Sequence, residues 1–331
     1  MKKVVVIKGD GIGKEVVPQA VRLLNAVTSD LELIPAHMGS ECNAIYGWYL
    51  PPATLERIKE SDAVLFGAIT TPIAAPNYRS PLLFLRREFD LFANVRPAKK
   101  IIPNLGIGDI DLVIVRENTE GMYTGLEREE NGTVILERRV SEKACRRIVR
   151  YAIDLCHRRR LTRIHCVHKA NVLRKSDGLF RRVFFEEVEG SGLEAREMLV
   201  DATAAALITK PHEFQCIVTL NLYGDILSDE AAALVGGLGF TPCGNIGESH
   251  SIFEPCHGSA PDIAGKGIAN PTATILSATM MLRHLHLCDE AELIEDALKR
   301  TYIEGISTPD VSGNYSTVGF TDQVISRLGK R

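Results

Sequence analysis

Two aspartates, Asp225 and Asp229, lie four positions apart in the stretch NLYGDILSDEAAALVGGLGF at residues 221–240. The residues after Gly224 favour a helix, and the cluster GGLG at residues 236–239 is expected to end it. Residues four apart share one face of a helix, where two like charges repel each other unless a cation lies between them. Hard ions such as Mg²⁺ and Mn²⁺ prefer carboxylate oxygens. The pair therefore predicts a divalent-metal site, and a solvated acidic turn near a helix N-terminus is the alternative.

Three arginines, Arg86, Arg96 and Arg116, stand in or beside apolar segments of the chain. Arg116 directly follows the run DLVIV, which predicts a buried strand, and Tyr123 lies in the loop after it. A guanidinium in apolar surroundings normally has an anion as its partner. The arginines therefore predict a clamp for a substrate with several carboxylates, and separate salt bridges to nearby acids are the alternative.

Lys169 lies near the end of a segment that favours a strand, and Asp201 opens a segment that favours a helix. Lys169 lies near the end of the expected strand IHCVH, where desolvation can lower the pKa of a lysine and make it a base. An exposed loop lysine is an equally good interpretation. Asp201 opens the alanine-rich segment DATAAALIT, where helix capping is the default role and metal ligation the alternative.

Three loops carry polar or glycine-rich motifs. The turn GDGIGKE at residues 9–15 has Lys14 where the dinucleotide fingerprint needs a third glycine, and it lacks the GK[ST] ending of a P-loop. Thr70 and Thr71 follow the expected strand DAVLFGAI and predict either ligand contacts or ordinary turn chemistry. The segment FEPCHGSAPDIAGKGIANPTATILSATMMLRHL predicts a long Gly/Pro-rich loop before an apolar helix, and its polar candidates are His257, Asp262 and Asn270. Such loops inside compact domains are usually functional.

Composition and length set the class of the protein. The chain has 331 residues, too many for one small core and suited to two domains. Its formal net charge of −3 gives no indication of a nucleic-acid or membrane partner. Eight cysteines without a CxxC pair predict free thiols in a reducing compartment, and the N-terminus lacks a signal-peptide core, so we expect a cytoplasmic location. Short apolar strands alternate with helical segments, and no Pro/Ser linker separates two halves, which predicts an α/β fold with interleaved domains.

Six motifs, taken in order, resemble the β-decarboxylating dehydrogenases, the family of isocitrate, isopropylmalate and homoisocitrate dehydrogenases. They are GDGIGKE, LRREFDLFANVRP, VIVRENTEGMY, HKANVL, NLYGDILSD and EPCHGSAPDIAGKGIANPTA, and together they span nearly the whole chain. The resemblance implies an isopropylmalate/isocitrate dehydrogenase-like fold, with two α/β domains sharing a large mixed sheet and a non-Rossmann cofactor site. Residues 1–91 plus 236–331 would form the cofactor-binding domain, and residues 92–235 the domain for substrate, metal and dimerisation.

The resemblance also implies roles for residues at matching positions. The substrate would be bound by Ser80, Leu83, Arg86, Arg96, Arg116, Tyr123, Lys169 and Asn171. Mg²⁺ or Mn²⁺ would be held by Asp225 and Asp229, with Asp201 from the second subunit of a homodimer, which could assemble further to a tetramer. Lys169, also from the second subunit, would be the base, and Tyr123 the acid that protonates the enol carbon after CO₂ leaves. The cofactor would be bound by Ile12, Thr70, Thr71, Asn171, His257, Gly258, Ser259, Ala260, Asp262, Ile263 and Asn270.

Cofactor and substrate preferences follow from the same comparison of motifs. Asp262 followed by Ile263 implies NAD, because a carboxylate there accepts bonds from the ribose hydroxyls and repels a 2′-phosphate, and the relatives that use NADP carry Lys-Tyr. In the segment 79–85, Leu83 resembles isopropylmalate enzymes and Ser80 resembles isocitrate enzymes, while the surrounding pattern is most similar to homoisocitrate dehydrogenases. The expected reaction is the oxidative decarboxylation of a (2R,3S)-2-hydroxy-3-carboxy acid, homoisocitrate to 2-oxoadipate in lysine biosynthesis, with some acceptance of isocitrate.

Three alternative functions remain open from the sequence. The first is 3-isopropylmalate dehydrogenase of leucine biosynthesis. The second is a non-catalytic regulatory subunit of a related hetero-oligomer, although such subunits usually lack a metal aspartate, the lysine or the tyrosine, all of which are present here. The third is an unrelated Mg²⁺-dependent phosphotransfer enzyme, against which the missing P-loop Ser/Thr argues.

Overall fold

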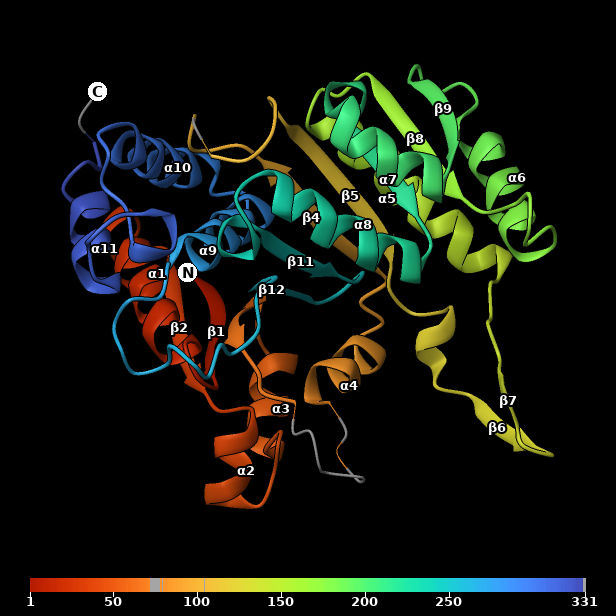
Figure 1. The fold of residues 1–331 in the computed structure, drawn as a ribbon. Coiled ribbons are helices and arrows are strands. Elements are labelled where there is room, and N and C mark those ends of the chain that lie inside the picture. Colours follow the sequence, from red (N-terminus) through yellow and green to blue (C-terminus); the bar gives the residue numbers. More distant parts are fainter. Residues whose placement is uncertain (72–77, 79, 104, 330–331) are drawn as a thin grey trace.

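A ten-stranded mixed sheet runs through the whole molecule (Figure 1). The computed structural model describes residues 1–71, 78, 80–103 and 105–329, so position 79 of the segment 79–85 lies outside the described residues. The strand order is β2-β1-β3-β12-β11-β4-β5-β10-β8-β9. The strands are β1 (Lys2–Gly9), β2 (Leu31–Ala36), β3 (Ala63–Ala68), β4 (Ala93–Lys99), β5 (Asp111–Glu117), β8 (Arg163–His168), β9 (Glu194–Leu199), β10 (Cys216–Thr219), β11 (Pro242–Ile246) and β12 (Ser251–Pro255).

Helices cover the sheet on both faces (Figure 1). They are α1 (Gly13–Val27), α2 (Ser40–Tyr46), α3 (Pro52–Lys59), α4 (Pro81–Glu88), α5 (Glu142–Arg158), α6 (Ser176–Val188), α7 (Val200–Thr209), α8 (Asn221–Leu234), α9 (Thr272–His284), α10 (Cys288–Ile303) and α11 (Thr317–Ile325), with short 3₁₀ turns η1 (Met122–Thr124), η2 (Pro211–Glu213), η3 (Leu238–Phe240) and η4 (Pro309–Val311). Strands β3 and β10 are buried along their whole length, as expected for strands covered on both faces. The predicted α/β fold with one shared mixed sheet is confirmed.

The sheet consists of two parallel blocks that run in opposite directions. Strands β2, β1, β3 and β12 are parallel to one another, and so are β5, β10, β8 and β9. Between the blocks, β11 is antiparallel to β12 and β4, and β4 is antiparallel to β5. The first block and β11 come from residues 1–91 and 236–331, and the second block and β4 come from residues 92–235. The domain boundaries themselves stay a prediction.

Pairing at the centre of the sheet places polar residues on one face. Asn94 on β4 lies opposite both Arg116 on β5 and Asn245 on β11. Two residues before Asn245 on β11, Cys243 lies opposite Glu254 on β12. Because side chains alternate between faces, these five residues share one face of the sheet.

The glycine turn at the start of α1 joins two loops. Gly9 and Gly11 have φ values of +72° and +54°, in the left-handed region that favours glycine. A Cβ on Gly9 would lie 1.8 Å from the carbonyl oxygen of Ala68, and a Cβ on Gly11 would lie 2.1 Å from that of Ser259. The glycines therefore allow the turn to pack directly against the end of β3 and against the loop after β12.

Helix α8 begins at Asn221, one turn earlier than the sequence predicts, so Gly224 lies inside the helix. The predicted end is confirmed, because Gly236 and Gly237 follow the helix with φ values of +116° and +104°. The two-stranded hairpin of β6 (Glu127–Glu130) and β7 (Thr133–Leu136) extends away from the body (Figure 1). Among the described residues, no helix has the length and apolarity needed to cross a membrane. All eight cysteines are free of disulfide bonds.

Candidate active site

Two arginines meet the acidic face of α8 at the centre of the sheet. Arg116 donates from Nη1 to Asp225 Oδ1, and Arg96 Nη2 lies 3.4 Å from the same oxygen. Arg96 Nη1 also donates to Ser228 Oγ at 2.7 Å and to Asp229 Oδ1 at 3.2 Å. The predicted metal aspartates and two of the predicted clamp arginines therefore occupy one site. The geometry agrees with both interpretations of these arginines. Arg96 and Arg116 lie together, as a carboxylate clamp requires, and each also forms a salt bridge to a nearby acid.

The first turn of α8 is shaped around Arg116, whose side chain is only 2% exposed. Asn221 Oδ1 accepts from Nε and Nη2 of Arg116 at 3.0 and 2.7 Å. A Cβ on Gly224 would lie 2.6 Å from Cβ and Cγ of Arg116, so glycine leaves the space through which the guanidinium reaches Asp225. Burial and the charge of Arg96 lower the pKa of Arg116 to about 10, which still leaves it a cation at neutral pH.

Tyr123 lies over this cluster from the loop after β5. Its hydroxyl donates to Asp225 Oδ2, and the guanidinium carbon of Arg116 is 5.1 Å from the ring centroid. Burial and the bond to Asp225 raise the pKa of Tyr123, so the hydroxyl stays protonated. Burial would raise the pKa of Asp225, but Arg116, the Tyr123 hydroxyl and Arg96 outweigh it and lower that pKa. Burial raises the pKa of Asp229, against the opposing charge of Arg96.

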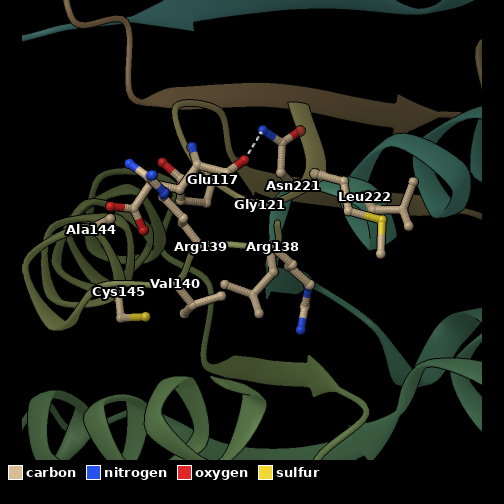
Figure 2. Close-up of a pocket in the computed structure, with 12 residues that line it drawn as sticks. Glu117, Gly121, Arg138, Arg139, Val140, Ala144, Cys145, Asn221 and Leu222 are labelled. Atoms are coloured by element: carbon tan, nitrogen blue, oxygen red, sulfur yellow. Dashed lines mark hydrogen bonds between the residues drawn. The ribbon is translucent and has the colours of Figure 1, made fainter. Parts of the chain in front are cut away.

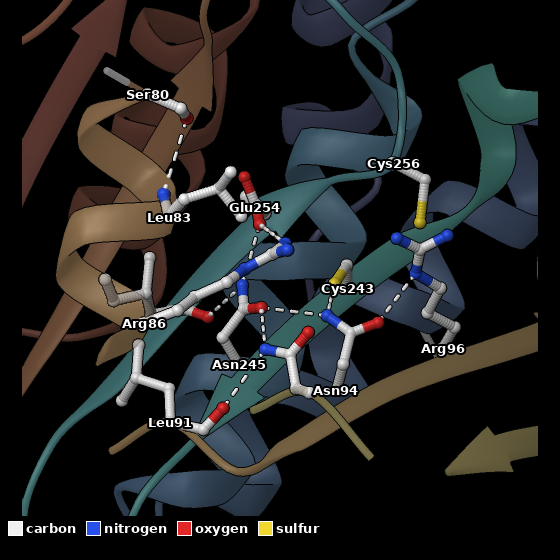
Figure 3. Close-up of polar contacts among 12 residues, drawn as sticks. Ser80, Leu83, Arg86, Leu91, Asn94, Arg96, Cys243, Asn245, Glu254 and Cys256 are labelled. Atoms are coloured by element: carbon white, nitrogen blue, oxygen red, sulfur yellow. Dashed lines mark hydrogen bonds and ion pairs between the residues drawn. The ribbon is translucent and has the colours of Figure 1, made fainter. Parts of the chain in front are cut away.

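A buried chain of polar groups connects Arg96 with Arg86 across three strands (Figure 3). Arg96 Nε donates to Asn94 Oδ1 at 2.8 Å, and Asn94 Nδ2 donates to Asn245 Oδ1, also at 2.8 Å. Asn245 Nδ2 donates to Glu254 Oε1 at 2.7 Å, and Arg86 Nη2 lies 3.4 Å from that oxygen. Asn94 and Asn245 are fully buried, and a hydrogen-bonded network of this kind fixes the direction of its members. The two guanidinium groups are therefore held at a set spacing.

A cleft of about 170 Å³ opens beside Arg86 and Arg96. It is lined by the end of β3, by α4 and by the residues that end and follow β12: Phe66, Gly67, Ala68, Ile69, Leu82, Arg86, Arg96, Cys243, Glu254, Pro255, Cys256, His257 and Gly258. The cleft thus joins the arginine cluster to the loops from which the sequence predicts cofactor contacts.

The expected cofactor residues Ile12, Thr70 and Ser259 are brought together beside the glycine turn. Thr70 Oγ1 donates to Ser259 Oγ at 2.7 Å, and Ile12 N donates to the Ser259 carbonyl at 2.9 Å. Asp10, which sequence reasoning did not select, organises this corner: its buried carboxylate accepts backbone N–H bonds from Thr70 at 2.9 Å and from Ser40 at 2.9 Å. Thr71 is exposed at the end of the same turn.

The loop after β12 presents the remaining cofactor candidates. Nδ1 of His257 bonds the Gly258 carbonyl at 2.9 Å, while its Nε2 is buried without a hydrogen-bond partner in the described part of the chain. Burial lowers the pKa of His257, so the ring is neutral. A neutral ring with a free, buried nitrogen in a cleft fits a hydrogen bond to a bound ligand.

Asp262 is exposed in a turn that begins at Ala260, which has a φ of +41°. Ile263 donates from its N–H to the Ala260 carbonyl at 3.1 Å and packs toward Ile12 and Val16. Asn270 is differently placed, since its amide is bonded to Asp310, to Thr272 N and to Tyr302 within the protein.

Lys169 and Asp201 pair with each other and lie apart from the arginine cluster. Lys169 Nζ donates to Asp201 Oδ1, and both follow strands, β8 and β9, that are two and three places from β5 in the sheet. Neighbouring strands lie about 4.8 Å apart, so Lys169 and Asp201 are on the order of 10–14 Å from Arg116 along the sheet. Asp201 is not an N-cap, because the helix begins at Val200 and the carboxylate bonds Lys169 instead. Asn171, two residues beyond Lys169, is exposed.

The described residues contain no group of three His, Cys, Asp or Glu side chains placed to hold a metal ion. Asp225 and Asp229 fit such an ion as two carboxylates on one face of α8, and further ligands would have to come from outside this set.

The residues predicted to choose the substrate lie at the start of α4. Ser80 is its N-cap, and its Oγ accepts from Leu83 N at 3.4 Å. The side chain of Leu83 is 39% exposed and that of Phe84 is 44% exposed. An apolar surface therefore faces outward where α4 approaches the cleft.

A second cavity, of about 10 Å³, lies behind Asn221 (Figure 2). It has room for about one water molecule and none for a hydroxy acid. Asn221 Nδ2 donates there to the Glu120 carbonyl at 2.8 Å, and burial raises the pKa of the neighbouring Glu117. The Glu120 carbonyl thus fixes the Asn221 side chain, which in turn holds the guanidinium of Arg116.

Sequence reasoning missed the residues that position the arginines: Asn94, Asn221, Ser228, Asn245 and Glu254. The available signal was a polar residue inside an otherwise apolar strand, as in PCGNI and SIFEP. Such a residue needs a buried partner.

The chain is similar to known proteins over nearly its whole length. The model of the isocitrate/isopropylmalate dehydrogenase family matches residues 3–325. A homoisocitrate dehydrogenase of Methanocaldococcus jannaschii is 47% identical over 348 residues, covering 100% of this chain and 99% of the relative. A 3-isopropylmalate dehydrogenase of Methanothermobacter thermautotrophicus is 48% identical over 329 residues, covering 98% of each. The crystal structure of isocitrate dehydrogenase from Methylococcus capsulatus superposes with a TM-score of 0.94 at 39% identity, covering 99% of both chains.

Proposed function

Because the chain belongs to the isocitrate/isopropylmalate dehydrogenase family and is a decarboxylating dehydrogenase, we propose that it converts homoisocitrate to 2-oxoadipate with NAD and Mg²⁺ or Mn²⁺. The family uses NAD(P) and a divalent metal and acts on small hydroxy acids. The observation that carries the proposal is the convergence of Arg96 and Arg116 on Asp225, with Arg86 connected to Arg96 through the buried polar chain of Asn94, Asn245 and Glu254. Arg86 and Arg96 line the cleft and Arg116 lies behind Asp225, and a group of neighbouring cations of this kind suits a substrate with several carboxylates.

The arginines bind and orient this substrate. Arg116 is held by Asn221, and Arg96 by Asn94 and Ser228, so each guanidinium points in a fixed direction before the substrate arrives. A preformed clamp of this kind lowers the entropic cost of reaching the reactive geometry. The carboxylates of the substrate would take over from Asp225 and Asp229 as partners of the arginines.

The proton transfers need one base and one acid. When bound, NAD would accept the hydride in the oxidation, and the residues of this chain would remove the hydroxyl proton and, after CO₂ leaves, protonate the enol carbon. Tyr123 suits the role of acid because its hydroxyl is protonated at neutral pH and lies at the arginine cluster, where it donates to Asp225. Lys169 of a second copy is proposed as the base.

Asp225 and Asp229 would hold the divalent cation, and Asp201 of a second copy would complete the site. When bound, the cation would stabilise the negative charge that develops on the substrate oxygen as CO₂ leaves. Release of Asp225 from Arg116 and Arg96, as the substrate engages both arginines, would free its oxygens for this ligation.

Support for NAD comes from the loop after β12. Asp262 is exposed and its turn is tied to α1, because Glu15 accepts the N–H groups of Gly265 and Gly267 at 2.5 and 2.9 Å. A fixed carboxylate at this point would bind the ribose hydroxyls and disfavour a 2′-phosphate. The unpartnered Nε2 of His257 fits a contact to the same cofactor.

A homodimer is the smallest assembly that fits the proposal, and a tetramer would preserve the same shared sites. The β6–β7 hairpin lies outside the body, and an isolated two-stranded hairpin is only marginally stable in water. Val172 and Ile226, beside the predicted base and the first metal aspartate, are 64% and 59% exposed. Apolar side chains beside the site and an extended hairpin both suit a second copy of the chain as partner.

3-Isopropylmalate is the second candidate substrate. Leu82, which lines the cleft beside Arg86, and the exposed Leu83 on the same helix favour it. The test is kcat/KM for homoisocitrate, isocitrate and 3-isopropylmalate measured side by side with NAD and Mn²⁺. The proposal expects the highest value for homoisocitrate, and a higher value for 3-isopropylmalate would overturn it. A chain that turns over none of the three would instead support the regulatory-subunit alternative.

A further inference from the structure

Two cysteines lie next to each other in the wall of the cleft. Cys243 is on β11 and Cys256 directly follows β12, and both line the cleft of about 170 Å³. Since Cys243 is paired with Glu254, Cys256 is its diagonal neighbour on the same face of the two strands. Figure 3 shows Cys256 beside the guanidinium of Arg96. Burial would lower the pKa of Arg96, but the two cysteines and the aspartates near it outweigh burial and raise that pKa.

The surroundings of this pair favour a thiolate. Interaction with the Cys256 thiol, aided by the charges of Arg96 and Arg86, outweighs burial and lowers the pKa of Cys243 to about 7. The Cys243 sulfur also accepts a hydrogen bond from Asn94 Nδ2 at 3.0 Å. Because the thiolate is the reactive form of cysteine, a lowered pKa makes a thiol react faster at neutral pH.

A second thiol pair in the chain provides a comparison. Cys156 on α5 and Cys216 on β10 also interact through their thiols, but both are fully buried in the core and neither lines the cleft. What distinguishes Cys243 and Cys256 is therefore access from the cleft together with two neighbouring arginines.

We infer that Cys243 and Cys256 form a modification site, which small peroxides oxidise to a disulfide that inactivates the cleft. The inference concerns the cleft of this chain and holds for any hydroxy acid as substrate. In the first step the Cys243 thiolate attacks one oxygen of hydrogen peroxide, giving a sulfenic acid and hydroxide. The Cys256 thiol then attacks the sulfenic sulfur, the S–S bond forms, and water leaves. The peroxide takes up two electrons, and the pair loses them.

Closing this bond changes the position of Arg96. A disulfide needs Cα atoms about 4.4–6.8 Å apart, whereas diagonal cross-strand neighbours are typically about 7–8 Å apart. Cys256 lies beyond the last residue of β12 and is held to β11 by its N–H bond to the Thr241 carbonyl, at 3.0 Å. Drawing the two sulfurs together takes Cys243 away from Asn94, which holds Arg96 Nε at 2.8 Å. A shift of about 1 Å in a substrate-binding group lowers kcat/KM about 100-fold.

The decisive experiment maps the bond itself. A Cys288→Ser variant removes the exposed cysteine and leaves seven thiols. The native variant is treated with hydrogen peroxide, denatured and alkylated, and its peptides are analysed by mass spectrometry. We expect five free thiols, a disulfide joining Cys243 to Cys256, and recovery of both thiols and activity after dithiothreitol. A disulfide between other residues, or loss of activity with seven free thiols, would refute the inference.

Matched serine variants separate the two thiol pairs. Cys243→Ser should retain its own untreated activity after peroxide, because it lacks the attacking thiolate, whereas Cys156→Ser should be inactivated as fast as the parent. Equal inactivation of both variants would count against the site. Peptide mapping of the Cys288→Ser protein does not depend on substrate turnover or on the folding of these variants, so it decides the question even where homoisocitrate is the wrong substrate.

Discussion

Replacing Gly224 by alanine tests whether α8 is built around Arg116. The new Cβ would lie 2.6 Å from Cβ and Cγ of Arg116, whereas unstrained carbon contacts are about 3.5–4.0 Å. Arg116 must therefore move by about 1 Å, which takes its guanidinium away from Asn221 and Asp225. Misplacement on this scale lowers kcat/KM about 100-fold.

Gly224→Ala should lower stability only modestly. Overpacking costs about 1–3 kcal/mol, while alanine gains up to about 1 kcal/mol over glycine in a helix. We therefore expect the free energy of unfolding to fall by no more than about 2 kcal/mol, with the fold intact. Urea unfolding and kcat/KM, measured on the same preparation, separate the two effects.

Gly178→Ala is the matched control. Gly178 lies in helix α6, and a Cβ there would meet nothing within 4 Å. This variant should be more stable by up to about 1 kcal/mol, with unchanged kcat/KM. If Gly224→Ala behaves in the same way as Gly178→Ala, the geometric argument for Arg116 is wrong.

Four further predictions follow from the site and the core. Asn245→Ala should raise KM by at least about tenfold with little change in kcat, because it breaks the chain between the two clamp arginines and loosens substrate binding; an unchanged KM would show that the chain is only structural. Asp225→Asn should abolish turnover while the circular dichroism spectrum stays native. A chelator should also abolish turnover, and adding Mg²⁺ or Mn²⁺ should restore it. Undiminished activity in either experiment contradicts the metal assignment. Asp262→Lys combined with Ile263→Tyr should shift the kcat/KM ratio from NAD toward NADP, and a constant ratio would remove the argument for NAD. Burial lowers the pKa of His165 from 6.5 to about 4, so the unfolded chain binds the proton first as pH falls. Up to about 3 kcal/mol of stability should therefore be lost between pH 6.5 and 4. An equally steep loss in His165→Leu would show that His165 is not its origin.

Several site features were predictable because they depend on local patterns. The glycines of GDGIGKE indicated a tight turn, and the structure shows that Gly9 and Gly11 make room for the backbone of Ala68 and Ser259. The interpretation of Asp201 as a helix cap was wrong, since α7 begins at Val200, two residues earlier than a cap at Asp201 requires, and the carboxylate bonds Lys169. Capping depends on where a helix begins, and sequence patterns locate that point only within a few residues.

The sequence by itself determined the α/β class, the family resemblance and the kinds of side chain that the chemistry requires, because periodicity and motif order are properties of neighbouring residues. Only the tertiary structure decided that Arg86 and Arg96 are tied together through Asn94, Asn245 and Glu254. That connection depends on the register of β11 between β4 and β12, strands that are distant in sequence. Register is set by packing of the whole sheet, so no local pattern contains it.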